Sequence, residues 1–526
     1  MSSRWMQSNP IVRKSSTLRA RSGASPRVLV AATCAAWLLG FASAPTALAQ
    51  ASDTSKAPVA PKAAAKPIAT IADVVAALNA EPSQKVTEAK RSWKTIADAW
   101  LDMTAPPMPV GEALSVGSVH PKMKDWDKVA AWAKANPGMA KALHTSRDSV
   151  GFALPYGEQN VDEKYRNKGF FVKVGLDGDA RIIDYAYMRA IDTIAVYAVA
   201  EMYRLLEEGK PKEAFTVATD AARLLRQLFD RVTLFEKSKV FDLASDSLAA
   251  HRDAMYVYRD RIPKEVFQEI ALKEYPFLTP KRQRLEMPEG DRFVAEQVLR
   301  STFDPRGQAD PAKFADVFGE IQSLDKPLTI FGAARRWKNL AAVHGSLESS
   351  LQKLTNIYDD WWRRWRMPQY DPMMDLPTEL SRTNPIRYGG VIYSIRDLQS
   401  LFEQRRRVLA EVGATAMAAG LSGYRREYGN DPDDREKAYA VFVRKASDFD
   451  PWDKQYGRFL YRYQGAQRQA VDTPAGRIWV DGGVLYARGQ DNEDNDFKEV
   501  TPDGSHGDVL FWPPVRALER AQGLRE

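Results

Sequence analysis

Apolar residues recur at helical spacing along most of the chain. From residue 71 to residue 366, their three- and four-residue spacing predicts successive amphipathic helices, of which the longest span 185–207, 212–235 and 331–366. The exception is 170–183, where two short apolar runs flank a Gly-containing turn and predict a β-hairpin. We therefore expect a helical body over residues 71–366 with one small hairpin near 170–183.

A second folded unit is predicted beyond this body. Residues 367–394 are rich in proline and lack a period, which is typical of a connector. A helical apolar stripe then runs from 395 to 428, where the breaker at Gly429 would end the helix. Short β-type runs follow at 459–463, 484–487 and 509–512. The expected fold class is mainly α: a helical body followed, over residues 395–526, by a small α+β C-terminal module with one long helix and a short antiparallel sheet.

The first 49 residues, 1–49, have the features of an export signal in the usual order. Basic residues without any acidic residue occupy 1–27, an uncharged apolar run covers 28–41, and the small residues at 47–49 suit signal peptidase. We expect cleavage before Gln50, which gives a periplasmic or cell-envelope product without stable membrane insertion. The alternative is an uncleaved anchor, because the apolar region nearly reaches the roughly 20 residues of a spanning helix.

Charge and cysteine content narrow the function classes of the exported product. Loss of the six basic residues of the signal would lower the net charge from +7 to +1, so little positive charge remains to attract nucleic acid. The single cysteine, Cys34, lies within the signal, which excludes disulfides, thiolate zinc sites and a cysteine nucleophile from the product. Residues 50–70 are rich in Ala, Pro and Lys and are expected to form a disordered spacer.

The sequence contains no familiar catalytic signature. Its five histidines form no zinc-binding pair, and neither a nucleophile elbow nor a phosphate-binding Gly-rich loop is present. Acidic pairs occur at 207–208, 359–360 and 433–434, but neighbouring carboxylates on a helix point about 100° apart. We therefore assign no catalytic residue and keep a cell-envelope glycan hydrolase that uses such a pair as the alternative function.

An acidic loop near the end of the chain is the candidate metal site. Asp491, Asp494 and Asp496 crowd together between two β-type runs, and Asp508 follows just before the second run. Carboxylates this close repel one another, and calcium, with its flexible shell of oxygen ligands, would relieve that repulsion. The competing interpretation is a solvated acidic turn, because Asp and Asn are common in loops.

A tryptophan cluster is the candidate binding surface. Trp361, Trp362 and Trp365 lie in an Arg-rich stretch of the predicted helix 331–366, and Trp361 and Trp365 share one face of it. Exposed, this face would be an aromatic platform for glycan. The competing interpretation, which we favour, is that these rings pack in the helical core with arginines stacked on their edges.

Four landmarks follow one another between residues 409 and 515: Tyr424-Arg-Arg-Glu-Tyr-Gly429, Asp450-Pro-Trp452 with Phe459-Leu-Tyr-Arg-Tyr463, Tyr486-Ala-Arg-Gly-Gln-Asp491, and Gly507-Asp-Val509. Their order resembles the globular domain of the major pseudopilin of type II secretion. That family holds calcium between its last strands, so the resemblance implies carboxylate ligands at Asp491 and Asp508, completed by Asp494 or Asp496. Residues 497–506 are an insertion relative to the family, and its uncleaved N-terminal helix is missing.

The whole chain also resembles large exported bacterial proteins that combine a helical body with such a module, a likeness that implies an architecture and no activity. The function predicted from the sequence is therefore an exported structural or binding scaffold of the cell envelope. Its partner would be an envelope protein or a polymer, and calcium would be its structural ion.

Overall fold

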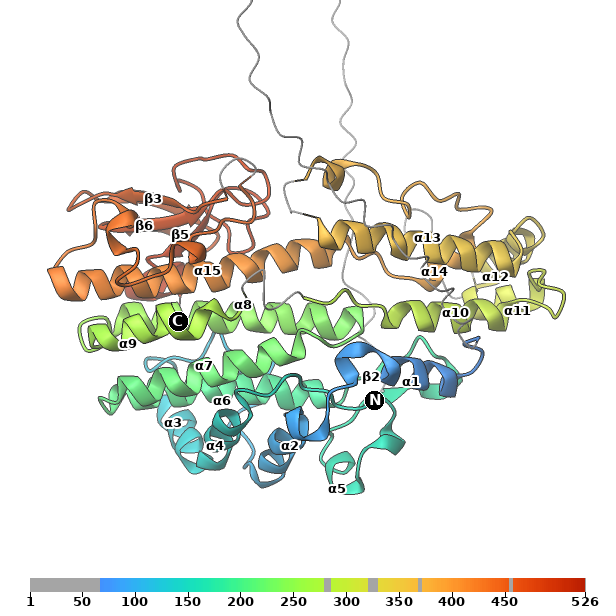
Figure 1. Cartoon of the computed structure of the whole chain (residues 1–526), viewed down its shortest axis with the longest axis horizontal. Coiled ribbons are helices and arrows are strands. Elements are labelled where there is room, and N and C mark those ends of the chain that lie inside the picture. Colours follow the sequence, from blue (N-terminus) through green and yellow to red (C-terminus); the bar gives the residue numbers. More distant parts are fainter. Residues whose placement is uncertain (1–66, 279–284, 320–329, 368–370, 454–456, 526) are drawn as a thin grey trace, which may run out of the picture. The chain divides into compact units, whose positions relative to one another are not determined.

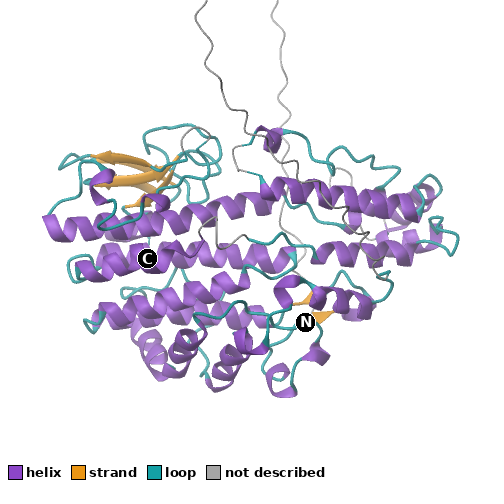
Figure 2. Cartoon of the chain, viewed as in Figure 1, coloured by secondary structure: helices purple, strands orange, loops and turns teal. Residues whose placement is uncertain are grey.

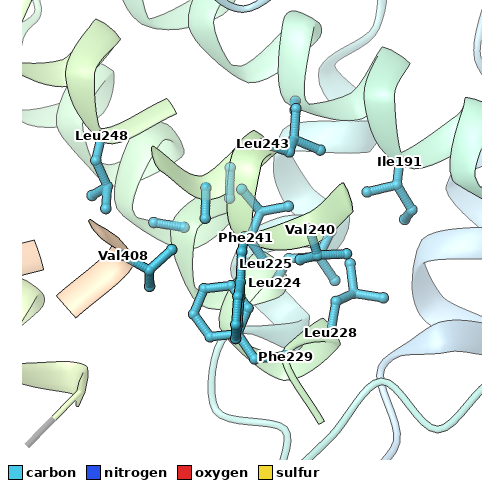
Figure 3. Packing of buried hydrophobic residues seen from close by; sticks show 14 of the residues in the cluster. Ile191, Leu224, Leu225, Leu228, Phe229, Val240, Phe241, Leu243, Leu248 and Val408 are labelled. Carbon is cyan, nitrogen blue, oxygen red and sulfur yellow. The ribbon is translucent and has the colours of Figure 1, made fainter. Parts of the chain in front are cut away.

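Helix α8 (Leu234–Val257) is enclosed by other helices. It lies along α15 (Gln399–Tyr428) and also contacts α6 (Tyr187–Glu207) and α7 (Pro211–Leu228), as Figure 1 shows. Its buried residues occur on all sides of the helix, which is expected for a helix surrounded by protein. In the core drawn in Figure 3, the rings of Phe229 and Phe241 meet edge to face at 4.9 Å.

The computed structural model describes residues 67–525, except 279–284, 320–329, 368–370 and 454–456, within one compact unit that begins at Lys66. The predicted export signal and most of the predicted spacer lie outside the described residues. The last residues of the spacer region are described and are already structured. Ile68 is buried, and the side chain of Thr70 accepts a hydrogen bond from the amide of Asp73 and so caps helix α1.

The other elements follow in chain order. In the first part of the chain they are α1 (Ile71–Ala80), α2 (Trp93–Asp102), α3 (Trp126–Ala135), α4 (Pro137–Ser146), α5 (Glu163–Arg166), β1 (Lys173–Val174), β2 (Ile183–Asp184), α9 (Lys264–Glu269), α10 (Gly290–Thr302), α11 (Pro311–Phe318), α12 (Ile330–Ala341), α13 (Leu347–Arg366) and α14 (Gly389–Ser394). In the C-terminal module they are β3 (Leu460–Tyr463), β4 (Gln469–Thr473), β5 (Gly476–Val480), β6 (Gly483–Ala487), β7 (Val509–Trp512) and α16 (Val515–Ala521). The prediction of a mainly α chain with a small β-containing module is confirmed (Figure 2).

Several predicted elements have different bounds in the structure. The helix expected over 331–366 is two helices, α12 and α13, because Ser346 caps α13 by accepting a hydrogen bond from the amide of Ser349. The helix expected over 212–235 ends at Leu228, and α8 begins at Leu234. In both cases the apolar pattern continues across a break, so the pattern alone hides the boundary.

Helix α4 begins with two residues that often end a helix. Pro137 and Gly138 open it, and Pro137 occupies its first turn, where a missing amide costs nothing. The predicted hairpin near 170–183 is confirmed, since β1 pairs antiparallel with β2. The predicted connector 367–394 contains α14, which packs on α10 and α13.

The C-terminal module contains a three-stranded antiparallel sheet of order β3-β6-β7 and a separate β4-β5 hairpin (Figure 2). The predicted strands are confirmed, whereas β4 and β5 were not predicted. Strand β6 is buried along its whole length, because it is the central strand of its sheet. Val471 of the hairpin and Tyr486 of β6 belong to a small apolar core that also contains Phe497 of the acidic loop.

Buried ion pairs join this module to the helical body. Arg252 of α8 pairs with Glu411 of α15, and both side chains are only 4% exposed. The neighbouring Asp253, 3% exposed, pairs with Arg516 at 3.1 Å and with Arg520 at 3.3 Å, both on α16. A charge removed from water is costly unless it is paired, so these pairs fix where α16 can dock.

Glycines let α15 approach its neighbours closely. A Cβ at Gly413 would lie 2.7 Å from the carbonyl oxygen of Ser447, and one at Gly420 would lie 2.5 Å from Cβ of Val443. Both neighbours belong to the loops that follow α15, so the small residues bring those loops onto the helix. Among the described residues, the helices lack the combination of length and apolar character that a membrane crossing requires.

Candidate functional site

The acidic loop lies between β6 and β7 and is shaped by its own carboxylates. Asp491 accepts a hydrogen bond from the amide of Gly507 at 2.9 Å, which joins the two ends of the loop. Asp494 accepts one from the hydroxyl of Tyr486 at 3.2 Å. Both aspartates are exposed. Asp491 and Asp494 also accept hydrogen bonds from the amides of Glu493 and Asp496, each at 3.0 Å, and such local bonds are what turn-forming aspartates make without any ion.

Asp496 pairs with an arginine of a neighbouring strand. Its Oδ1 lies 2.6 Å from a terminal nitrogen of Arg462 on β3. Asp496 and Phe497 have positive φ angles of 59° and 48°, a backbone conformation that costs a non-glycine residue about 1–3 kcal/mol. The ring of Phe497 is fully buried and meets Tyr486 edge to face at 5.0 Å. Burial of this ring offsets the strain of the loop.

Asp508 differs from the other three carboxylates because it is fully buried. Its Oδ2 accepts a hydrogen bond from the amide of Phe497 at 2.7 Å, while its Oδ1 has no hydrogen-bond partner of good geometry in the described part of the chain. Burial raises the pKa of Asp508 to about 7, and the charges of Asp494 and Asp491 add to this rise, while the backbone amides of Phe497 and Asn495 oppose it. The sequence therefore predicted the right neighbours for Asp508, but not its burial.

These observations test whether the loop fits a calcium ion. In favour, Asp508 presents a buried oxygen without a hydrogen bond of good geometry, and Asp491 and Asp494 lie within electrostatic reach of it. Against, no three His, Cys, Asp or Glu side chains of the described residues are gathered closely enough to hold a metal. Calcium also takes backbone and water oxygens, so three carboxylates in contact are not required. The donor chemistry fits, and the exposed side chain of Asp494 would have to turn toward Asp508.

Trp361 and Trp365 are buried on α13. They are 1% and 3% exposed, and they meet Tyr358 and Phe402 edge to face at 5.0 Å and 5.3 Å. The indole nitrogen of Trp365 donates a hydrogen bond to the backbone oxygen of Leu285. Rings enclosed in this way offer no face to a glycan, which favours the core-packing interpretation.

Trp362 is half-buried and points in another direction. Its indole nitrogen donates to Glu289, and the guanidinium of Arg366 lies 4.0 Å from its ring centre. Because the faces of an indole attract cations, the accessible part of this ring already has a partner. The three tryptophans do not form one surface.

The acidic pairs at 207–208, 359–360 and 433–434 are engaged in local contacts. Glu207 accepts a hydrogen bond from the indole of Trp126 at 2.8 Å. Asp360 pairs with Arg364 at 3.0 Å. Asp433 pairs with Lys437 at 2.6 Å. The pairs lie on separate elements and their described contacts are of this ordinary kind, so the geometry gives the hydrolase hypothesis no specific support.

A buried charged cluster was missed by the sequence analysis. Glu236 of α8 is fully buried and accepts hydrogen bonds from Nε of Arg231 at 2.8 Å, from the hydroxyl of Tyr187 at 2.6 Å and from the hydroxyl of Tyr156. The guanidinium of Arg231 also lies 4.1 Å from the ring centre of Tyr156. Arg231 and Glu236 are close in sequence, but the tyrosines come from elsewhere, so only the fold assembles the cluster.

Comparison with known proteins gives nothing from which a function can be transferred, since no family model, curated protein or solved structure matches the chain. The resemblance of residues 409–515 to pseudopilins therefore stays a prediction. Function has to be argued from the residues described above.

Proposed function

We propose that this chain is an exported structural or binding protein of the cell envelope, whose C-terminal module is stabilised by calcium at the acidic loop. The observation that carries the calcium proposal is the buried carboxylate of Asp508, of which one oxygen has no hydrogen bond of good geometry among the described residues. In this proposal Asp508, Asp491 and Asp494 supply carboxylate oxygens, and Asp496 stays with Arg462. Calcium would neutralise the three charges and hold the two ends of the loop together.

The scaffold part of the proposal is supported by how the module is attached. The buried pairs of Arg252 with Glu411 and of Asp253 with two arginines fix α15 and α16 on α8. A module held in this way presents its loops in a constant orientation, which suits the binding of an envelope protein or a polymer. The proposed partner surface is therefore the loop side of the module, and not a catalytic cleft.

The calcium proposal predicts an ion-specific gain in stability. Thermal unfolding should be measured in calcium, in magnesium and in chelator. An ion present at a hundred times its dissociation constant stabilises the protein that binds it by about 2.7 kcal/mol, so we expect a higher melting temperature in calcium alone. In the variant Asp508→Asn the difference between calcium and chelator should vanish.

A matched control is Asp472→Asn, which changes an exposed carboxylate of the same module that pairs with Arg477. This variant should keep the full response to calcium. Identical melting curves of the unchanged protein in all three conditions would contradict the calcium site.

Export is tested by the mass of the protein recovered from a bacterial host. We expect a periplasmic product that begins at Gln50, because the small residues at 47–49 suit signal peptidase. Replacing Ala47 and Ala49 with bulky residues should block cleavage and leave the precursor in the membrane fraction. Recovery of the unchanged protein with residues 1–49 intact would overturn the prediction of a cleaved signal.

A further inference from the structure

A polar cleft of about 410 Å³ lies in the N-terminal part of the described chain. It is bounded by the turns that follow α1, by the start of α2 and by the segments around 153–155 and 160–162. Small-molecule pockets have volumes of about 300–1,000 Å³. The cleft is therefore at the small end of this range, and a ligand would also be small.

The walls of the cleft are held in place by hydrogen bonds. The amide of Asn79 bonds both the backbone nitrogen and the backbone oxygen of Tyr156, each at 2.9 Å. The backbone nitrogens of Ser92 and Trp93 donate to the carbonyls of Gly151 and Phe152 at 3.1 Å and 3.2 Å, which ties the start of α2 to the facing segment. A site whose walls are fixed in this way loses little freedom when a ligand binds.

The buried cluster around Glu236 also supports the floor of the cleft. Nη1 of Arg231 donates to Oε1 of Gln84 at 3.1 Å and to the backbone oxygen of Leu154 at 2.6 Å. A guanidinium can only donate, so it requires the oxygen of the Gln84 amide. Gln84 is one of the residues that line the cleft, so Nε2 of its amide is the end that could donate to a ligand.

The charged side chains around the cleft alternate in sign. Lys94 pairs with Glu88, and the charges of Glu88 and then Asp162 raise the pKa of Lys94. The hydrogen bond and the charge of Lys94 lower the pKa of Glu88, and the charge of Arg91 lowers it further. Asp162 begins α5 but makes no capping hydrogen bond with its side chain. The cleft therefore offers two cations and two carboxylates, with no net charge.

One backbone position in the lining is strained. Ala153 has a φ angle of 50° and is only 4% exposed. This left-handed conformation is costly for any residue with a Cβ, and such strain concentrates at binding and catalytic sites. Its neighbours Phe152 and Leu154 are fully buried, so their packing holds Ala153 in this conformation.

This lining discriminates between classes of ligand. A multiply charged anion would be repelled by Glu88 and Asp162, and a cation would be repelled by Arg91 and Lys94. A neutral sugar would not compensate the charges of these ions. A small molecule with separate positive and negative ends matches both signs.

We propose that the cleft is a binding site for a small zwitterion of the amino-acid or dipeptide class. Arg91 takes the carboxylate of the ligand with its terminal nitrogens, because its Nε already donates to the backbone oxygen of Val86 at 2.6 Å. Asp162 takes the ammonium group, since Glu88 is already paired with Lys94. The side-chain amide of Gln84 donates to a carbonyl of the ligand. The site lies on segments that share no residue with the acidic loop, so this inference does not depend on calcium or on export.

Calorimetric titration of the full chain with alanyl-alanine tests the proposal. Two derivatives, N-acetyl-alanyl-alanine and alanyl-alanine amide, each lack one of the two charges, and glucose and inorganic phosphate represent the excluded classes. We expect binding of alanyl-alanine and an affinity at least about tenfold lower for each derivative, because each derivative loses the hydrogen bonds that one of its charged ends makes. Glucose and phosphate should give no heat of binding.

Two variants locate the site. Asp162→Asn removes the proposed ammonium ligand and should weaken alanyl-alanine binding about tenfold or more. The matched control Asp102→Asn changes an exposed aspartate at the end of α2 and should leave the affinity within about twofold. Melting curves of both variants would show that they are folded. No heat with alanyl-alanine at millimolar concentration, equal binding of the acetylated form, preferential binding of glucose or phosphate, or unchanged affinity of Asp162→Asn would each overturn the proposal.

Discussion

Replacing Glu236 with glutamine is expected to lower the free energy of unfolding by about 3–5 kcal/mol. Glutamine keeps the size of the side chain but removes the charge that balances Arg231, which is 1% exposed. Burial raises the pKa of Tyr156 and of Tyr187 well above its usual value, so both hydroxyls stay protonated and donate to Glu236. A glutamine nitrogen cannot accept these hydrogen bonds. The measurement is urea unfolding followed by circular dichroism.

The matched control for this prediction is Glu427→Gln. Glu427 pairs with Lys264, but these side chains are 37% and 38% exposed, and exposed pairs contribute only about 0–1 kcal/mol. The two variants make the same chemical change in different surroundings. Equal, small losses in both would mean that Arg231 finds water or another partner, and would contradict the account of the cluster as a buried pair.

Stability should fall steeply in acid because of His251. This residue is 1% exposed and is hydrogen-bonded to the hydroxyl of Tyr275. Burial, with smaller contributions from the charges of Arg252 and Arg516, lowers the pKa of His251 from its usual 6.5 to about 3. Below pH 6.5 the unfolded chain binds a proton at this position, while the folded chain does not until about pH 3. The stability contributed by the neutral ring is therefore present above pH 6.5 and is lost as the pH falls from 6.5 to 3.

The loss from this one group approaches about 5 kcal/mol, since each pKa unit corresponds to about 1.4 kcal/mol. Carboxylates titrate in the same pH range. The pH dependence of stability is therefore compared between the unchanged protein and the variant His251→Gln. Glutamine does not titrate and can still form a hydrogen bond with Tyr275. The stability of the variant should therefore depend less on pH between 6.5 and 3 than that of the unchanged protein. The variant His506→Gln, at an exposed histidine, should follow the unchanged protein. Parallel curves for all three proteins would show that His251 is protonated in the folded state at mild acidity.

How far the sequence predicts the fold depends on whether a feature is local. Helices α6 and α15 were predicted nearly to their ends because a helical apolar stripe needs only neighbouring residues. The break between α12 and α13 was missed, although Ser346 is a residue that often caps helices. In the sequence, this break is marked by one residue only, while the apolar stripes of the two helices on either side of it are long. Hairpin β4-β5 was missed because its first strand, Gln469–Thr473, has only two apolar residues, Ala470 and Val471.

The candidate sites divide in the same way. The acidic loop was found because its aspartates are close together in the sequence, and the structure adds what the sequence lacks, which is the burial of Asp508 and the turn of Asp496 toward Arg462. The cleft had no local signal. Gln84, Arg91 and Asp162 come from separate turns, and each alone is an ordinary polar residue. Only the fold brings them to one cavity.

The contacts of Arg520 also bear on the order in which the chain folds. This side chain reaches Asp253, 267 residues earlier, and the backbone oxygen of Gly117, 403 residues earlier. Closing such long loops costs entropy before any contact forms, and folding slows as contacts become more distant in sequence. Helices α6, α7 and α8, which are neighbours in sequence, can assemble first, while Asp253 still lacks both of its arginines. Docking of α16 is then a late step, and it completes the core only after the rest of the chain has found its place.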